Sequence, residues 1–114
     1  MNNIFYKLRN KRNDMLIILT TTPNKKEAKN IARILFEYKL VACIQITKIS
    51  SMYLWESKLC DEKEFLLYIK TQQKHAETIK NIIIQYHSYD IPEIIEIAPN
   101  NVNKKYLEWI RTTT

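Results

Sequence analysis

Glycine is absent from this chain of 114 residues, and other features that mark particular protein classes are scarce. Without glycine, tight turns must be built from Asn, Asp, Ser or Pro, and only three prolines are present. The apolar runs are a few residues long, whereas a membrane-spanning helix needs about 20 apolar residues. The sequence therefore predicts no membrane span.

Cysteine is also scarce, since Cys43 and Cys60 are the only two. Neither belongs to a C-x-x-C pair, and a disulfide framework normally needs more cysteines in a secreted chain. Residues 1–14 have no apolar segment of the kind that a secretory signal contains. We therefore expect reduced thiols and a cytoplasmic location, with organelle targeting by the basic N-terminus as a weaker alternative.

The net charge of +6 is concentrated at the N-terminus. Half of it comes from residues 1–14, and acids and bases are interspersed over the rest of the chain. Interspersed charges of this kind are typical of an ordinary solvated surface, so we expect no nucleic-acid partner. We predict a basic tail without fixed structure at residues 1–14, followed by one domain at residues 15–114.

The domain alternates strand and helix patterns. Residues 15–19 form an apolar run, and Asn24 with Glu27 then resembles a capping pair that opens a helix. Ala28, Ile31 and Leu35 share one face of that helix. Further patterns predict strands at 41–55 and 63–70, a helix at 73–87, a strand at 91–98 and a helix at 103–111. This β-α-β-β-α-β order with a C-terminal helix predicts an α+β, ferredoxin-like sandwich.

The two middle strands are unusually long and apolar on both faces. Helices can cover only one face of the sheet, so Tyr53, Trp55, Leu66 and Tyr68 would form an exposed patch on the other. Exposed patches of this kind usually mark a subunit interface. The pattern therefore predicts self-association.

Seven short strings follow one another over about residues 15–111. They are Thr20-Thr21-Thr22-Pro23, the helix stripe from Ala28 to Leu35, Leu40-Val41-Ala42-Cys43-Ile44, Ser51-Met52-Tyr53-Leu54-Trp55, Glu64 with Ile69-Lys70-Thr71, residues 87–95 (HSYDIPEII) and Tyr106-Leu107-Glu108-Trp109-Ile110. In their order and spacing, these strings resemble the CutA divalent-cation tolerance family. Two departures occur, with Ser57 at a family glycine after the Trp bend and Ser88 at a family proline after the histidine.

The resemblance implies a homotrimer formed through the long strands, and a connection with copper and other divalent metals. Copper(II) favours imidazole with carboxylate, and copper(I) favours thiolate. The candidate ligands for copper(II) or another divalent metal, which would not be needed for folding, are Cys43, His87, Glu93 and Glu64. The resemblance places Cys43 at the family's cysteine position.

Other residues are candidates for a cleft or an interface, and each has a structural alternative. Lys70 and Tyr89 would contact an anion in a cleft between subunits, or Lys70 is an ordinary surface lysine. His87 caps its helix and packs against Tyr89, unless it lines that cleft, and Cys43 is a small buried hydrophobe unless it binds metal. The aromatic residues expected to pack the core and the trimer interface are Tyr53, Trp55, Tyr68 and Trp109.

Catalysis is not expected, because the chain has no P-loop, H-E-x-x-H or G-x-S-x-G string. An RNA-recognition module is also disfavoured, since Phe65 and Tyr68 face opposite sides of a strand and cannot form one stacking platform. Two hypotheses remain. The first is a trimeric CutA-like protein that binds divalent cations, and the second is a PII-like regulatory trimer that binds a small anion or metabolite between subunits.

Overall fold

The computed structural model describes residues 14–114, so the predicted basic tail lies outside the described residues except for Asp14. Its elements follow the predicted order. They are β1 (Met15–Thr22), α2 (Lys25–Glu37), β2 (Cys43–Trp55), β3 (Lys58–Gln72), the short 3₁₀ turn η1 (Gln73–His75), α3 (Ala76–Tyr86), β4 (Ile95–Ile97) and α4 (Lys104–Thr113).

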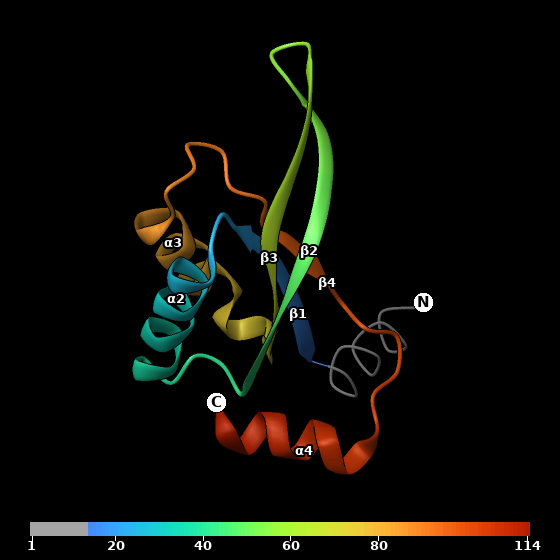
Figure 1. Ribbon diagram of the computed structural model, residues 1–114. Helices are drawn as coiled ribbons and strands as arrows, with labels where there is room; N and C mark the ends of the chain where they lie inside the picture. The colour runs from blue at the N-terminus through green and yellow to red at the C-terminus, as the bar shows by residue number, and fades with distance from the viewer. Residues whose placement is uncertain (1–13) are drawn as a thin grey trace.

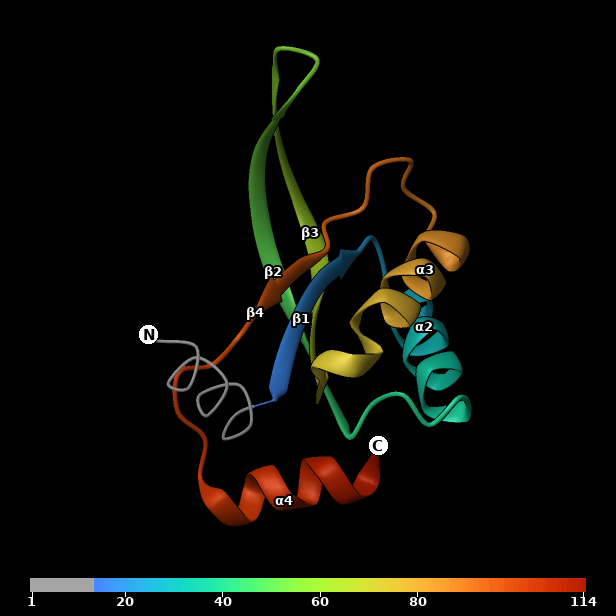
Figure 2. The same ribbon diagram turned by 180° about the vertical axis from the view of Figure 1, so that it is seen from behind.

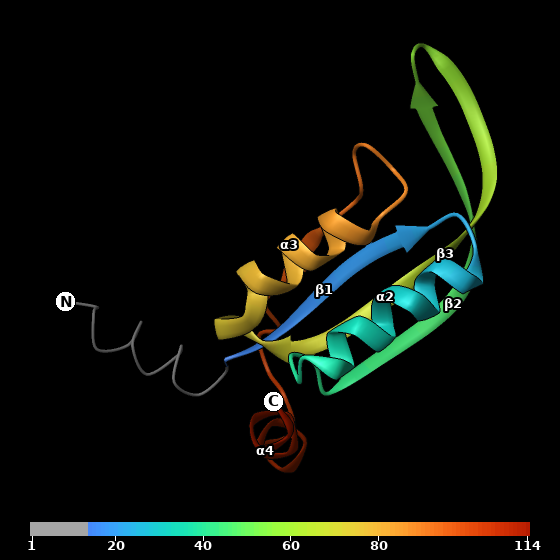
Figure 3. The ribbon, with the colours of Figure 1, turned by 90° about the vertical axis from the view of Figure 1, so that its left-hand side faces the viewer.

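The four strands form one antiparallel sheet in the order β2-β3-β1-β4. Helices α2 and α3 lie on the same face of this sheet, and α4 lies across its lower end (Figures 1 and 2). The side view shows the two helices covering the sheet below the point where β2 and β3 extend beyond it (Figure 3). This arrangement confirms the predicted ferredoxin-like fold.

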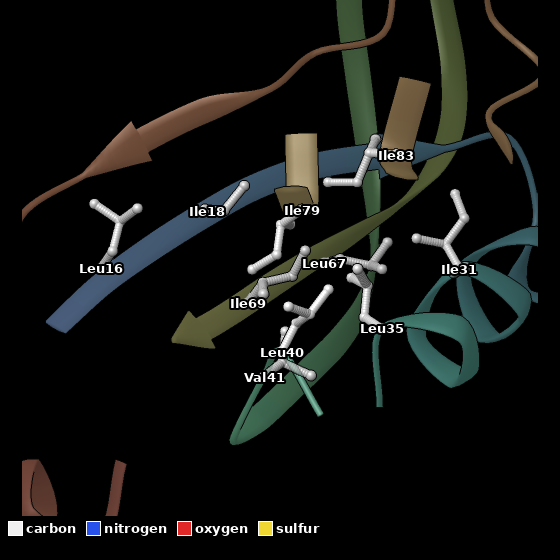
Figure 4. Close-up of a cluster of buried hydrophobic side chains, with 11 residues drawn as sticks. Leu16, Ile18, Ile31, Leu35, Leu40, Val41, Leu67, Ile69, Ile79 and Ile83 are labelled. Carbon is white, nitrogen blue, oxygen red and sulfur yellow. The ribbon is translucent and has the colours of Figure 1, made fainter. Parts of the chain in front are cut away.

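The main core lies between the sheet and these two helices (Figure 4). The apolar stripe predicted for the first helix is confirmed, because Ala28, Ile31, Ala32 and Leu35 are all buried. The buried stripe on α3 is narrower than that on α2. Ile79 and Ile83 are buried, whereas Tyr86 is exposed.

A second, smaller cluster attaches α4 to the sheet. Met15, Ala42, Leu107 and Ile110 are buried there. Beside them Arg111 Nε donates to Asp14 Oδ1 across 2.9 Å. This contact joins the residue just before β1 to α4.

The β2–β3 hairpin is longer than predicted. Its pairing runs without interruption from Cys43 opposite Lys70 to Trp55 opposite Lys58, and its end projects beyond the sheet (Figure 1). The predicted start at residue 63 was wrong because backbone pairing continues through the polar segment before it. The two-residue turn has φ 51° at Glu56 and φ 64° at Ser57, the positive values of a type I′ turn.

The predicted last strand was too long. Only Ile95–Ile97 pairs with β1, and residues 88–94 form a loop. Pro92 has no N–H to donate to a ladder. Other contacts, described below, hold this loop instead.

Candidate functional site

A cleft of about 780 Å³ lies between the projecting hairpin and the loop that follows α3. The hydrogen bond from Tyr89 of this loop to Glu64 of β3 joins the two segments. Of its lining residues, Thr21 comes from β1, Tyr53 and Glu64 come from the hairpin, and Tyr89 and Glu93 come from the loop. Segments far apart in the sequence therefore form one concave surface.

His87 attaches the loop to the sheet. Its ring is fully buried and its Nε2 lies 2.7 Å from the carbonyl oxygen of Thr21. Because a carbonyl can only accept, Nε2 carries the proton, and Nδ1 accepts the backbone N–H of Tyr89 at 3.0 Å. Both nitrogens are therefore occupied by backbone groups, and neither is available as a metal ligand. The geometry favours the structural role predicted for His87.

Glu27 joins the same loop to the start of α2. Its backbone N–H donates to Asn24 Oδ1 at 2.8 Å, which confirms Asn24 as the N-cap of the helix. Its carboxylate lies 3.4 Å from His87 Nδ1 and accepts the backbone N–H of Ser88 at 3.1 Å. The loop is thus tied to a helix as well as to the sheet.

Tyr89 and Glu64 form the buried wall of the cleft. The hydroxyl of Tyr89 donates to Glu64 Oε2 at 2.9 Å, and its ring lies 4.8 Å from the ring of His87. Burial, together with the hydrogen bond to Glu64, raises the pKa of Tyr89 above its usual value. Tyr89 therefore stays a neutral donor, while Glu64 is a carboxylate that is only 6% exposed.

The cleft is acidic although the chain is basic. No Lys, Arg or His is among its lining residues. Four carboxylates line it: Glu62, Glu64, Asp90 and Glu93. Burial, with a hydrogen bond donated to Glu62, also raises the pKa of Tyr53. A concave surface with charge of one sign concentrates ions of the other sign, so this cleft attracts cations.

The structure brings some of the predicted site residues together and separates others. Glu64, Glu93 and Tyr89 line the cleft. Cys43 and Lys70 face each other at the opposite end of the hairpin, where Lys70 Nζ lies 5.5 Å from the ring of Tyr106. Cys43 and Lys70 therefore do not line this cleft, and the predicted metal contact of Cys43 and the predicted anion contact of Lys70 between subunits stay predictions.

Sequence reasoning missed Glu62 and Asp90, which also line the cleft, as Cys60 does. Glu62 could have been found, because it lies two residues from Glu64 and shares its face of the strand. The position of Cys60 in the cleft depends on the hairpin register, which sets it opposite Tyr53. Within residues 14–114, no three or more His, Cys, Asp or Glu side chains gather closely enough to hold a metal ion by themselves.

The predicted interface residues lie at the surface. Trp55 is 50% exposed on the hairpin, and Tyr53 and Tyr68 are each 36% exposed. Trp109 is also partly exposed and stacks against Tyr106 with ring centroids 5.5 Å apart. The predicted exposed patch is therefore present in the single chain.

Comparison with known proteins gives a direct assignment. A family model described as CutA1 divalent ion tolerance protein matches residues 16–113. The chain belongs to the CutA1 family. This confirms the resemblance drawn from the seven strings, and the matched span covers every strand and helix of the fold except the first residue of β1.

Relatives in distant organisms support the same assignment. The chloroplastic protein CutA of Arabidopsis thaliana is 36% identical over 100 residues, covering 87% of this chain and 55% of the relative. The chain thus spans about half the length of that relative. The divalent-cation tolerance protein CutA of Pyrococcus horikoshii is 34% identical, over 84% of this chain and 94% of the relative.

Solved structures match the whole fold. The crystal structure of CutA1 from the psychrotrophic bacterium Shewanella sp. SIB1 has a TM-score of 0.85 at 33% identity, covering 90% of this chain and 97% of that one. The periplasmic divalent cation tolerance protein CutA from Archaeoglobus fulgidus has a TM-score of 0.84 at 34% identity, covering 87% and 97%. Within residues 14–114, this chain has no helix long and apolar enough to cross a membrane.

Proposed function

We propose that this protein binds divalent cations in the acidic cleft and thereby contributes to divalent-cation tolerance. One observation carries the proposal: in a chain with net charge +6, the cleft is lined by four carboxylates and no basic side chain. The names of the Pyrococcus and Archaeoglobus relatives, divalent-cation tolerance proteins, agree with a cationic ligand.

The available donors decide which metals suit the cleft. Carboxylate and hydroxyl oxygens favour magnesium, calcium and manganese, whereas copper(II) favours imidazole. The cleft has oxygen donors and the thiol of Cys60, and both nitrogens of the neighbouring His87 are engaged. We therefore propose that the cleft binds a divalent cation through oxygen atoms and that water completes the coordination of this cation. Copper(II) is the comparison metal in the test of this proposal.

We also propose that the working form is a homotrimer. The hairpin carries Met52, Leu54 and Leu59 into solvent, and Leu54 is 75% exposed. A projecting two-stranded hairpin with apolar side chains gains stability when a second surface covers it. A neighbouring subunit would do so, and its groups could add ligands beside the cleft.

We also propose that the protein binds its ligand and does not catalyse a reaction, and that it is located in the cytoplasm, as predicted from the unpaired cysteines.

The PII-like alternative needs one change, in the charge of its ligand. Four carboxylates would repel a small anion, so a metabolite that enters this cleft should be cationic.

Native mass spectrometry combined with calorimetric titration of manganese(II) and copper(II) tests both parts. We expect a species of three 13.7 kDa chains, with manganese affinity lowered at least about tenfold in Glu62→Gln and Glu64→Gln. Glu77→Gln, an exposed carboxylate on α3, and Cys43→Ala are matched controls that should bind like the wild type. A monomer would overturn the trimer, and unchanged affinity in both cleft variants would overturn the metal site.

A further inference from the structure

Acids and bases are interspersed along the sequence, but the fold separates them. The end of the molecule opposite the hairpin tip, here called the basal end, consists of Asp14 and residues 36–43, 70–77 and 104–114 (Figures 1 and 2). These segments contain two more bases than acids, and residues 1–13, which lead into Asp14, contain four bases and no acid. The rest of the chain contains eight of each. The basal end and the segment before it therefore carry the whole net charge of +6.

Hydrogen bonds between distant segments hold the basal end together. The backbone N–H of Gln73 donates to the carbonyl oxygen of Asp14 at 2.9 Å, and Arg111 Nε donates to the carboxylate of the same residue. The hydroxyl of Thr71, near the end of β3, donates to the carbonyl oxygen of Leu40 in the turn after α2. The start of β1, the end of β3, the turn after α2 and helix α4 therefore form one fixed surface.

The turn after α2 presents two aromatic rings on this surface. Phe36 is 45% exposed and Tyr38 is 64% exposed. The backbone N–H of Lys39 donates to the carbonyl oxygen of Phe36 at 2.9 Å, and that of Leu40 donates to Leu35 at 3.1 Å. These bonds close the helix end and fix the direction of the turn. Aromatic rings held beside a lysine combine an apolar body with a charged head, as side chains at a membrane–water interface do.

Bases and apolar groups together favour a lipid surface over a nucleic acid as the partner. Clusters of about four to eight Lys or Arg residues bind the anionic surface of a membrane, and neighbouring apolar side chains enter its interfacial region. Residues 1–13 place their four bases next to Ile4, Phe5 and Leu8. A nucleic-acid backbone would pair with the charges but would give these apolar side chains no apolar partner. Four lysines of the basal end are exposed: Lys39, Lys74, Lys104 and Lys105.

The basal end stays accessible in the assembly proposed above. The apolar side chains that a neighbouring subunit would cover, Met52, Leu54 and Leu59, lie on the hairpin. Helix α4 and the end of α2 lie at the other end of the chain (Figure 1). A trimer that forms through its hairpins therefore leaves its basal ends free to meet a larger surface.

We propose that the basal end, together with residues 1–13, docks on the surface of a membrane that contains anionic lipids. The lysines attract the lipid headgroups, and Phe36 and Tyr38 enter the interfacial region. The inference is independent of the cation site, because no residue of the basal end lines the cleft.

Flotation of the full chain with vesicles of phosphatidylcholine and phosphatidylglycerol in equal parts tests the inference. We expect binding that weakens as salt is added, and vesicle affinity lowered at least about tenfold when Lys104→Gln and Lys105→Gln are combined. Lys25→Gln with Lys26→Gln is the matched control, because these exposed lysines are also the first two residues of a helix. They lie about 18 Å along α2 from the basal end, more than twice the Debye length of about 8 Å, so the control should bind like the wild type.

A ring variant separates docking from simple charge attraction. Tyr38→Ser should weaken vesicle binding without changing its salt dependence, because it removes an apolar contact and no charge. Native mass spectra and manganese(II) titrations of all these variants should match the wild type, which separates a loss of docking from a loss of assembly or of the cation site.

Three results overturn the inference: no binding to the anionic vesicles, equal binding to vesicles of phosphatidylcholine alone, or equal losses from the two lysine pairs. Binding of a duplex oligonucleotide without binding of vesicles would assign the basal end to a nucleic acid and overturn the inference as well.

Discussion

The inner and outer halves of the β2–β3 hairpin share one continuous ladder but differ in what packs against it. In the inner half Leu67 and Ile69 are fully buried under α2 and α3. In the outer half Leu54 and Leu59 are 75% and 65% exposed. Backbone pairing thus fixes how long the hairpin is, whereas side-chain burial fixes where it contributes stability. The outer half carries apolar surface that a single chain does not cover.

The largest expected effect is a core truncation in the inner half. Leu67→Ala should lower the free energy of unfolding by about 2–5 kcal/mol, because it removes buried methyl groups and leaves a cavity. The expected loss is the same at every protein concentration. Urea denaturation followed by circular dichroism measures it.

Leu59→Ala in the outer half is the matched control for this comparison. At protein concentrations that favour the single chain, it should change stability by less than about 0.5 kcal/mol, as exposed positions usually do. At high concentration it should weaken the oligomer. A concentration-independent loss as large as that of Leu67→Ala would show that the two halves do not differ in this way.

A medium effect is expected where the loop meets the hairpin. Tyr89→Phe leaves Glu64 without its hydrogen bond, which should cost about 1–3 kcal/mol at neutral pH. The pH dependence should change too. The raised pKa of Tyr89 means that the folded state keeps its proton above about pH 10, where the unfolded chain loses it, so wild-type stability is present below that pH and falls above it.

Urea denaturation between about pH 9 and pH 11 measures this fall, which should be shallower in Tyr89→Phe. It should not vanish, because the pKa of Tyr53 is raised as well. Tyr38→Phe, at the exposed end of α2, is the control and should follow the wild type. A slope in Tyr89→Phe equal to that of the wild type would contradict the assignment.

The smallest expected effect lies at the tip of the hairpin. Ser57 has φ 64°, a left-handed conformation that costs a residue with a Cβ about 1–2 kcal/mol relative to glycine. Glycine also has more freedom in the unfolded chain, so Ser57→Gly should stabilise by about 0.5–1 kcal/mol, read from the thermal midpoint. Ser51→Gly, within extended β2, should destabilise instead, and the same sign for both would reject this explanation.

Hydrophobic spacing was sufficient to predict the order of elements and the buried face of α2. It was not sufficient for element ends. The segment containing Asp61, Glu62 and Lys63 is polar, so its continuation as strand depended on pairing with β2, which no local pattern reveals. The hairpin register also sets Cys43 opposite Lys70, at the end of the hairpin away from the cleft.

The sequence predicted those residues of the candidate site that belong to the strings shared with the CutA family. Glu64, Glu93 and Tyr89 line the cleft. The role of His87 depended on which atoms face its two nitrogens, and these come from β1 and from the loop two residues later. Spacing along the chain identifies a histidine as a candidate, but only three-dimensional contacts show whether its nitrogens are available.

Ser88 has a thermodynamic consequence. Its N–H donates to Glu27, and a proline, which the resemblance gives at this position in the family, has no N–H to make that bond. Proline would instead restrict the unfolded chain. The two residues thus hold the same loop by different means, one by adding enthalpy to the folded state and the other by removing entropy from the unfolded state. The loop of this chain should therefore loosen more steeply on warming than one held by proline.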